Sequence, residues 1–251
     1  MTAHCHHPRK CAAWTSRTFV WILSAVLCSE SWADIKSKEG AWPPFLPAPS
    51  QVPDADVVQD LWENVTFKRA VEAPQLNVPM PVYESIIDAP DILAAAANHL
   101  GLTDESAEAA PDGGFELHSP DGSVARYRVL VREKERRIIL SQGTLVLSGL
   151  AVKATVLGEL RISMSNNLIH QNLRVFIRVK NPILSWFAHF VVYFLPKVAD
   201  QELLRGFRLT HGVATWAASD PAGFCHWLAS RPSTVRTTNL ERALACLEHV
   251  Q

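Results

Sequence analysis

Residues 152–164 read VKATVLGELRISM, and this stretch decides the fold because its apolar and polar side chains alternate. Alternation with a period of two places one set of side chains on each face of a β-strand. The sequence therefore predicts a long strand with one face in the core and the other in water. The core set is Val152, Ala154, Val156, Gly158, Leu160, Ile162 and Met164, and the water set is Lys153, Thr155, Glu159, Arg161 and Ser163.

The same alternation continues on both sides of this strand. After Asn166-Asn167, which can adopt positive φ in a tight hairpin, residues 169–180 alternate again and include Leu173 and Val175. Upstream, residues 126–132 alternate, the charged residues 133–136 form a turn, and 138–147 follow as a mixed apolar strand that ends at the turn Ser148-Gly149. Strands joined by short turns predict an antiparallel meander with one face in water.

A helix that would cover the apolar face is predicted after Pro182, because proline suits the first turn of a helix. Residues 183–195 would be apolar on nearly every side of a helix, and Pro196 kinks or ends that segment. A second helical stretch runs from Lys197 to about Ser219 and carries an apolar stripe. The stripe consists of Val198, Leu203, Leu204, Phe207 and Val213.

Shorter elements are expected before and after the meander. A proline-rich linker over 34–56 should be poorly ordered, and a helix over 57–77 should follow it. Residues 83–88 (YESIID) predict a strand, and 92–100 predict a helix with Asp91 as its N-cap and Gly101 after its end. The acidic stretch 103–114 predicts a loop or a frayed helix. Helices over 222–229 and 239–250 should form a C-terminal extension, 220–251.

This order of elements, together with Ile87-Asp88-Ala89-Pro90, resembles the START-like (SRPBCC) helix-grip superfamily. The resemblance covers roughly residues 81–219, within an expected domain of 78–219. It implies an α+β fold in which an antiparallel β-meander curves around a long C-terminal helix, with extra N- and C-terminal helices here. Cystatin-like and lipocalin-like folds also set helices against an antiparallel sheet.

The resemblance also implies a pocket between sheet and helix for a hydrophobic small molecule or lipid. The implied lining residues from the sheet are Val156, Leu160, Leu173 and Val175, and those from the closing helix are Trp186, Phe187, Phe190 and Phe194. His189 or Tyr193 would supply a polar contact. The alternative is a solid core, because an aromatic stripe beside an apolar sheet face fills any ordinary interior.

The first 33 residues have the order of a secretory signal peptide. Arg9, Lys10 and Arg17 precede an apolar stretch, 19–28, that is too short to span a bilayer. Ser31-Trp32-Ala33 offers small residues for cleavage before Asp34. We therefore expect a secreted or periplasmic protein.

Two alternatives concern the same segment. The bulky apolar stretch also suits an uncleaved N-terminal membrane anchor. A lipoprotein attached through Cys28 is disfavoured, because Leu27 stands where a small residue is required. No metal site is expected, because the residues that look like soft-metal ligands lie within the expected signal: His4, Cys5, His6, His7 and Cys11.

Cleavage would leave Cys225 and Cys246 as the only cysteines, in a chain bound for an oxidising compartment. They are candidates for a disulfide, with two buried thiols as the alternative. The mature chain would hold 21 Lys and Arg against 24 Asp and Glu. A net negative charge does not favour nucleic acid as a partner. Asn64-Val65-Thr66 is a glycosylation sequon whose use depends on the host.

No nucleophile elbow, HExxH motif or phosphate-binding loop occurs, so no cofactor is expected. The leading hypothesis is a non-catalytic exported binding module. A START-like cyclase or hydratase, using Asp88, His189 or Tyr193, is one alternative. The other is an envelope protein whose residues 183–195 contact a membrane surface or a partner. The arginines at 126, 128, 132, 136 and 137 could bind anionic headgroups, although interleaved acids favour a solvated sheet face.

Overall fold

A computed structural model describes residues 42–147, 150–180, 196–231 and 235–246. The chain divides into two compact units, Met1–Glu39 and Gly40–Gln251. All described residues belong to the second unit, and the fold below is the fold of that unit alone.

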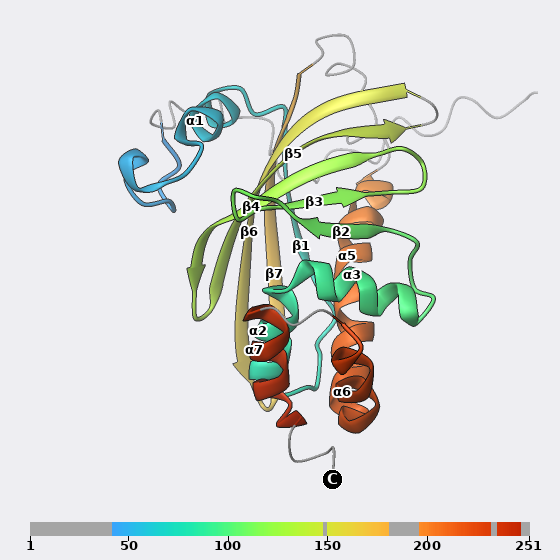
Figure 1. Cartoon of the computed structure of the whole chain (residues 1–251). Coiled ribbons are helices and arrows are strands. Elements are labelled where there is room, and N and C mark those ends of the chain that lie inside the picture. Colours follow the sequence, from blue (N-terminus) through green and yellow to red (C-terminus); the bar gives the residue numbers. More distant parts are fainter. Residues whose placement is uncertain (1–41, 148–149, 181–195, 232–234, 247–251) are drawn as a thin grey trace, which may run out of the picture. The chain divides into compact units, whose positions relative to one another are not determined.

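Within the described residues, seven strands form one antiparallel sheet, which curves strongly in Figure 1. Its order is β1-β7-β6-β5-β4-β3-β2, so the first strand along the chain lies beside the last. The strands are β1 (Phe67–Glu72), β2 (Ser106–Ala109), β3 (Phe115–His118), β4 (Val124–Glu133), β5 (Arg136–Leu147), β6 (Leu150–Ser165) and β7 (Leu168–Val179).

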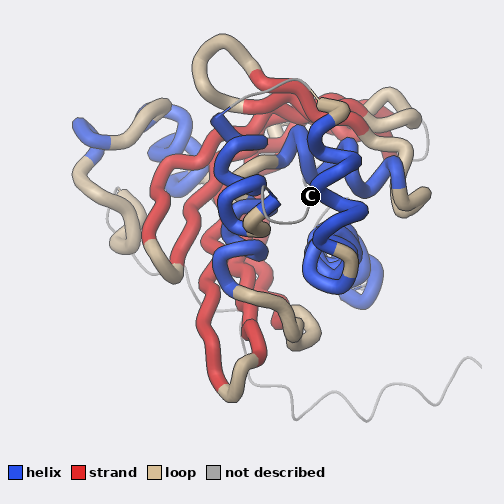
Figure 2. Tube along the Cα trace, turned by 60° about the horizontal axis from the view of Figure 1, so that its bottom comes forward, coloured by secondary structure: helices blue, strands red, loops and turns tan. Residues whose placement is uncertain are grey.

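Helices cover both faces of this sheet, but unequally. The face that packs against α2, α3, α5, α6 and α7 is called the inner face, and the face that packs against α1 is called the outer face (Figures 1 and 2). The helices are α1 (Ala55–Glu63), α2 (Met80–Ile87), α3 (Pro90–His99), α5 (Pro196–Ser219), α6 (Pro221–Ala229) and α7 (Val235–Ala243). None of the described helices is both long and apolar enough to cross a membrane.

The predicted meander and fold class are confirmed. Leu160 pairs with Leu173, and Val156 pairs with Ile177, so the apolar sets of β6 and β7 share the inner face. Asn166 and Asn167 both have positive φ, 53° and 61°, in the hairpin between these strands. The molecule is an α+β protein whose curved antiparallel sheet carries a long C-terminal helix, α5.

The inner stripe predicted for the long helix is also confirmed where side chains are described. Phe207 and Val213 are buried in the main core, and Leu203 and Leu204 pack against it. The apolar segment 183–195 precedes this helix in the sequence and was predicted to cover the sheet. It lies outside the described residues.

The strand predicted over 83–88 is wrong, because these residues belong to helix α2. Pro81 occupies its first turn, a position that tolerates proline. Val82, Tyr83 and Ile86 are buried together, which is one face of a helix rather than alternate positions of a strand. The next predicted helix is present as α3, although Ala89 is its N-cap and Asp91 lies in its first turn.

The helix predicted over 57–77 is wrong beyond Glu63. After α1 the chain enters β1, which pairs with β7 from Phe67–Ile177 to Glu72–Asn172. The edge of β7 offers a full ladder of backbone hydrogen bonds, and this long-range pairing outweighs the weak helical spacing. Strand β2 likewise lies within the predicted loop 103–114.

The proline-rich segment is ordered from Trp42 onward, contrary to the expectation for the linker. Its Phe45 ring stacks on Phe176 of β7, with centroids 5.4 Å apart, and lies edge-on to Trp62 of α1. The Trp42 indole donates a hydrogen bond to the Pro47 carbonyl at 2.8 Å. This segment and α1 together bury part of the outer face, which the sequence had predicted to be wet.

Candidate functional site on the inner face

The four sheet residues predicted to line a pocket lie together on the inner face. Val175 and Leu160 are buried, whereas Val156 and Leu173 keep part of their surface exposed. The other predicted lining residues lie outside the described part of the chain: Trp186, Phe187, His189, Phe190, Tyr193 and Phe194. The structure therefore shows that these four side chains share one face of the sheet, and the ligand site itself stays a prediction.

Burial changes along the inner face. Near the β6–β7 hairpin, Ile162 and Ile169 are fully enclosed by the helical layer. Farther along the strands, Ile139 and Ile177 are only half-buried, and Leu145 is 40% exposed. Apolar surface thus remains accessible on the side of the sheet that the helices cover.

A chain of three polar side chains crosses the packed end of this face. The Tyr83 hydroxyl on α2 donates to Oε1 of Gln171 on β7. Nε2 of Gln171 lies 2.7 Å from Nε2 of His211 on α5. Tyr83 and Gln171 are each 1% exposed, and His211 is half-buried. The chain links the two helices through one strand.

Burial keeps both ends of this chain uncharged near neutral pH. Loss of hydration raises the pKa of Tyr83, although the nearby Arg137 charge opposes the shift. The same loss of hydration lowers the pKa of His211 below its ordinary value. A neutral tyrosine and a neutral imidazole can each donate one hydrogen bond and accept another.

An ion pair joins the sheet edge to α5 closer to the start of that helix. Arg69 of β1 donates to both carboxylate oxygens of Asp200, at 2.6 and 2.7 Å. This bidentate pair lowers the pKa of Asp200 and raises the pKa of Arg69. Arg69 pairs with Val175 in the sheet, so Leu173 lies between the level of this ion pair and Gln171 on the same face of β7.

Asp88, predicted as either a turn residue or a base, forms ion pairs with two arginines. Arg137, 5% exposed, donates to both of its oxygens at 3.0 and 3.1 Å, and Arg132 lies 3.4 Å away. Glu84 is a further acid near Arg137, at 3.8 Å. These contacts favour the structural role, and the enzyme alternative rests on His189 and Tyr193.

The five arginines that could bind anionic headgroups, at 126, 128, 132, 136 and 137, are divided between the two faces of the sheet. Arg132 and Arg137 pair with Asp88 on the inner face, while Arg126 and Arg128 pair with Asp112 on the outer face. Arg136 pairs with Glu133. Each of these five arginines has an acidic partner, which supports a solvated sheet surface rather than a binding site for anionic lipid headgroups.

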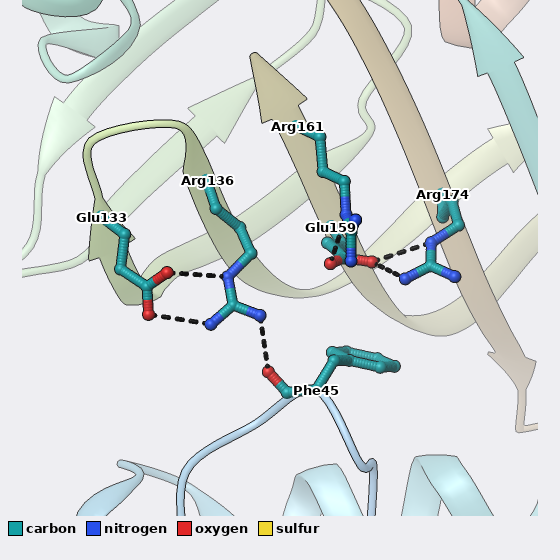
Figure 3. A network of polar contacts seen from close by, with 6 residues as sticks. All are labelled: Phe45, Glu133, Arg136, Glu159, Arg161 and Arg174. Atoms are coloured by element: carbon teal, nitrogen blue, oxygen red, sulfur yellow. Dashed lines mark hydrogen bonds and ion pairs between the residues drawn. The ribbon is translucent and has the colours of Figure 1, made fainter. Parts of the chain in front are cut away.

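The outer face holds a buried charge that the sequence had placed in water. Glu159 is fully buried, and it accepts hydrogen bonds from Arg161 at 2.9 Å and from Nε of Arg174 at 2.8 Å (Figure 3). Beside this cluster, Arg136 donates to the Phe45 carbonyl at 3.1 Å. These contacts help to hold the proline-rich segment against the sheet.

An open cleft of about 580 Å³ lies next to this network. Its lining is mostly polar and mixes both signs of charge, unlike the apolar inner face. The lining residues are Glu72, Glu135, Arg136, Arg161, Ile162, Ser163, His170, Gln171 and Asn172.

Cys225 on α6 and Cys246, just after α7, form a disulfide bond. Both cysteines are buried in the main core, beside Phe224 and Leu228. The bond ties the two C-terminal helices together over 21 positions of sequence. Among the described residues, no group of three His, Cys, Asp or Glu side chains could hold a metal ion.

Sequence reasoning did not single out the Tyr83, Gln171 and His211 chain. Tyr83 lay in a predicted strand, and His211 was one of several isolated histidines. The three residues are separated by 88 and 40 positions, so only the fold brings them together. The one local signal was Gln171 itself, a polar residue between Ile169 and Leu173 on the apolar side of the alternation.

Comparison with known proteins gives a likeness of fold. No protein-family model matches the chain, and no curated protein matches it in sequence. Solved structures, however, include a START superfamily protein from Mycobacterium smegmatis among the similar chains. That match has 12% identity and a TM-score of 0.32, over 54% of this chain and 95% of the other.

Two further solved structures are similar to this chain. A conserved protein from Geobacillus kaustophilus has 12% identity and a TM-score of 0.47, over 60% of this chain and 97% of that one. The di-domain ARO/CYC StfQ from the steffimycin biosynthetic pathway has 17% identity and a TM-score of 0.42. The match spans 66% of this chain and 56% of StfQ. At such values these matches describe the fold and carry no argument about function.

Proposed function

We propose that this START-like chain binds a hydrophobic small molecule between the inner face of its sheet and helix α5, without catalysing a reaction on it. The observation that supports this most is the accessible apolar surface at Ile139, Val156, Leu173 and Ile177. Half-buried apolar side chains on a helix-covered face gain further burial when another apolar group packs against them. Each square ångström so buried contributes about 25 cal/mol.

The polar groups near this face suit binding better than chemistry. Asp88 is held by Arg137 and Arg132, so both of its carboxylate oxygens already take part in ion pairs. The polar chain through Gln171 consists of neutral groups, which orient a ligand without needing a charge. Small-molecule sites commonly combine a mostly apolar lining with a few such placed polar groups.

Export of the chain is part of the proposal. The order of charge and hydrophobicity in residues 1–33 supports a cleaved signal. The disulfide between Cys225 and Cys246 adds support, because such bonds persist mainly in oxidising compartments. N-terminal sequencing of the protein from its host is expected to begin at Asp34. A chain that retains residues 1–33 would instead indicate a membrane anchor.

The binding experiment uses a pair of matched substitutions, each of valine to tryptophan. Val156 is half-buried on the inner face, whereas Val124 on β4 is 37% exposed and points to the outer face. Val156→Trp should fill accessible space and lower the affinity for an apolar fluorescent dye by roughly tenfold, about 1.4 kcal/mol. Val124→Trp should leave the affinity unchanged.

Mass spectrometry of organic extracts from the purified protein gives a second readout. A co-purifying apolar compound is expected with the wild type and should be depleted with Val156→Trp. Equal dye affinity in both tryptophan variants, together with clean extracts, would contradict the proposal.

A further inference from the structure

The polar chain through Gln171 is unusual because it lies inside an apolar core. A buried amide without partners costs about 1–3 kcal/mol, and a fully satisfied one contributes little net stability. Apolar residues of similar size would fill the same volume at no such risk. The chain therefore needs a reason beyond packing, and its half-buried end, His211, offers one.

The hydrogen bonds fix where the proton of His211 lies. Oε1 of Gln171 accepts from the Tyr83 hydroxyl, so the amide nitrogen of Gln171 faces the imidazole. An amide nitrogen only donates, and Nε2 of His211 must accept. In the neutral ring the proton then lies on Nδ1. His211 thus presents an N–H donor on the side of the ring that does not face Gln171.

The position of the chain along β7 places this donor at one end of the apolar inner face. From Gln171, the residues Leu173, Val175 and Ile177 follow on the same face. At about 3.3 Å per residue, the run from Gln171 to Ile177 is about 20 Å long. Leu173, next to Gln171 on this face, and Ile177 at the far end keep part of their surface exposed, whereas Val175 between them is buried. A guest anchored at His211 would lie against Leu173.

We infer that His211 is the polar anchor of the hydrophobic ligand, and that this ligand carries a neutral hydrogen-bond acceptor, such as a ketone or ester carbonyl, at one end. The inference rests on the proposed function. A donor that is held uncharged by its surroundings matches a carbonyl oxygen. An ammonium group would meet an N–H instead of a lone pair, and a carboxylate would bring an unpaired charge into an apolar space.

The test compares two probes that differ only in the acceptor. One is the aromatic ketone prodan, and the other is its analogue with a propyl group in place of the propionyl group. One neutral hydrogen bond should make the wild-type chain prefer the ketone by roughly three- to tenfold. His211→Phe should reduce this preference to about one while leaving the affinity for the propyl analogue within roughly twofold.

His211→Phe leaves the Gln171 amide without its acceptor and could therefore destabilise the fold. A second variant controls for this effect. The triple variant Tyr83→Phe/Gln171→Met/His211→Phe replaces every polar atom of the chain with an apolar group of similar size. It should fold and should show no preference between the probes. His226→Phe, on the exposed side of α6, is the matched control and should keep the wild-type preference.

The outcomes separate the two proposals. If the triple variant retains the ketone preference, or if the wild type has none, His211 is not the anchor, although binding itself stands. If neither probe binds the wild type, the proposed function fails and the inference fails with it. Long-range proton–nitrogen NMR gives an independent readout: the Nδ1–H tautomer of His211 is expected, and the Nε2–H tautomer would overturn the inference.

Discussion

The Tyr83 hydroxyl donates a hydrogen bond to the side-chain oxygen of Gln171, a residue 88 positions later in the chain. Tyr83→Phe removes this donor and leaves a buried carbonyl oxygen unsatisfied. We expect the free energy of unfolding to fall by about 1–3 kcal/mol in urea titrations. The triple apolar variant should be more stable than Tyr83→Phe, because it leaves no polar atom of the chain unpaired. An unchanged free energy of unfolding in Tyr83→Phe would show that the bond contributes nothing.

Stability should depend on pH through His211. Its folded pKa is lowered by burial, so the unfolded chain binds more protons as the pH falls below about 6.5. The wild type should therefore lose stability between about pH 7 and pH 5. The lowered pKa of Asp200 acts in a separate window, near and below its ordinary value of 3.8. Urea titrations of His211→Phe should show a smaller loss between pH 7 and 5, and an equal loss would contradict this assignment.

Substitutions in the cluster of Glu159, Arg161 and Arg174 should lower the free energy of unfolding by different amounts. Arg174→Met leaves the fully buried Glu159 carboxylate with one arginine, and should cost about 2–4 kcal/mol. Glu159→Gln should cost less, about 1 kcal/mol, because Arg161 and Arg174 are both partly exposed to water. Arg126→Met, at an exposed ion pair, is the control and should cost under about 1 kcal/mol. Equal losses for Arg174→Met and Arg126→Met would mean that Glu159 is not dependent on its partners.

The disulfide between Cys225 and Cys246 should stabilise the C-terminal helices against the core. Replacing both cysteines with alanine should lower the free energy of unfolding by about 3 kcal/mol, because the unfolded chain gains freedom over a loop of about 20 residues. Thermal unfolding of the wild type with reducing agent should approach that of the double variant. Identical melting temperatures with and without reductant would contradict this prediction.

The alternation in residues 152–180 predicted the central hairpin of the sheet, since a period of two has one structural meaning over so long a run. It could not predict β1, because pairing with β7 rather than local spacing makes Phe67–Glu72 a strand. Helix α2 was missed because YESIID is short and rich in isoleucine, and its contacts with the core decided the outcome.

Part of the candidate site was predictable for the same reason. Val156, Leu160, Leu173 and Val175 were placed on one face by their spacing alone. The Tyr83, Gln171 and His211 chain was not predictable, because its members come from two helices and a strand that only the tertiary fold brings together. The proline-rich segment likewise packs beside the buried Glu159, as Phe45 in Figure 3 shows, and no periodicity indicates this packing.

The central claim, that an apolar molecule binds on the inner face, is tested most directly by methyl NMR during titration with prodan. The methyl signals of Val156, Leu173 and Ile177 are expected to shift and to show contacts with the probe. The methyl signals of Val131 and Leu157, buried on the outer face, should stay in place. Shifts confined to the outer face, or no shifts at saturating probe, would contradict the account.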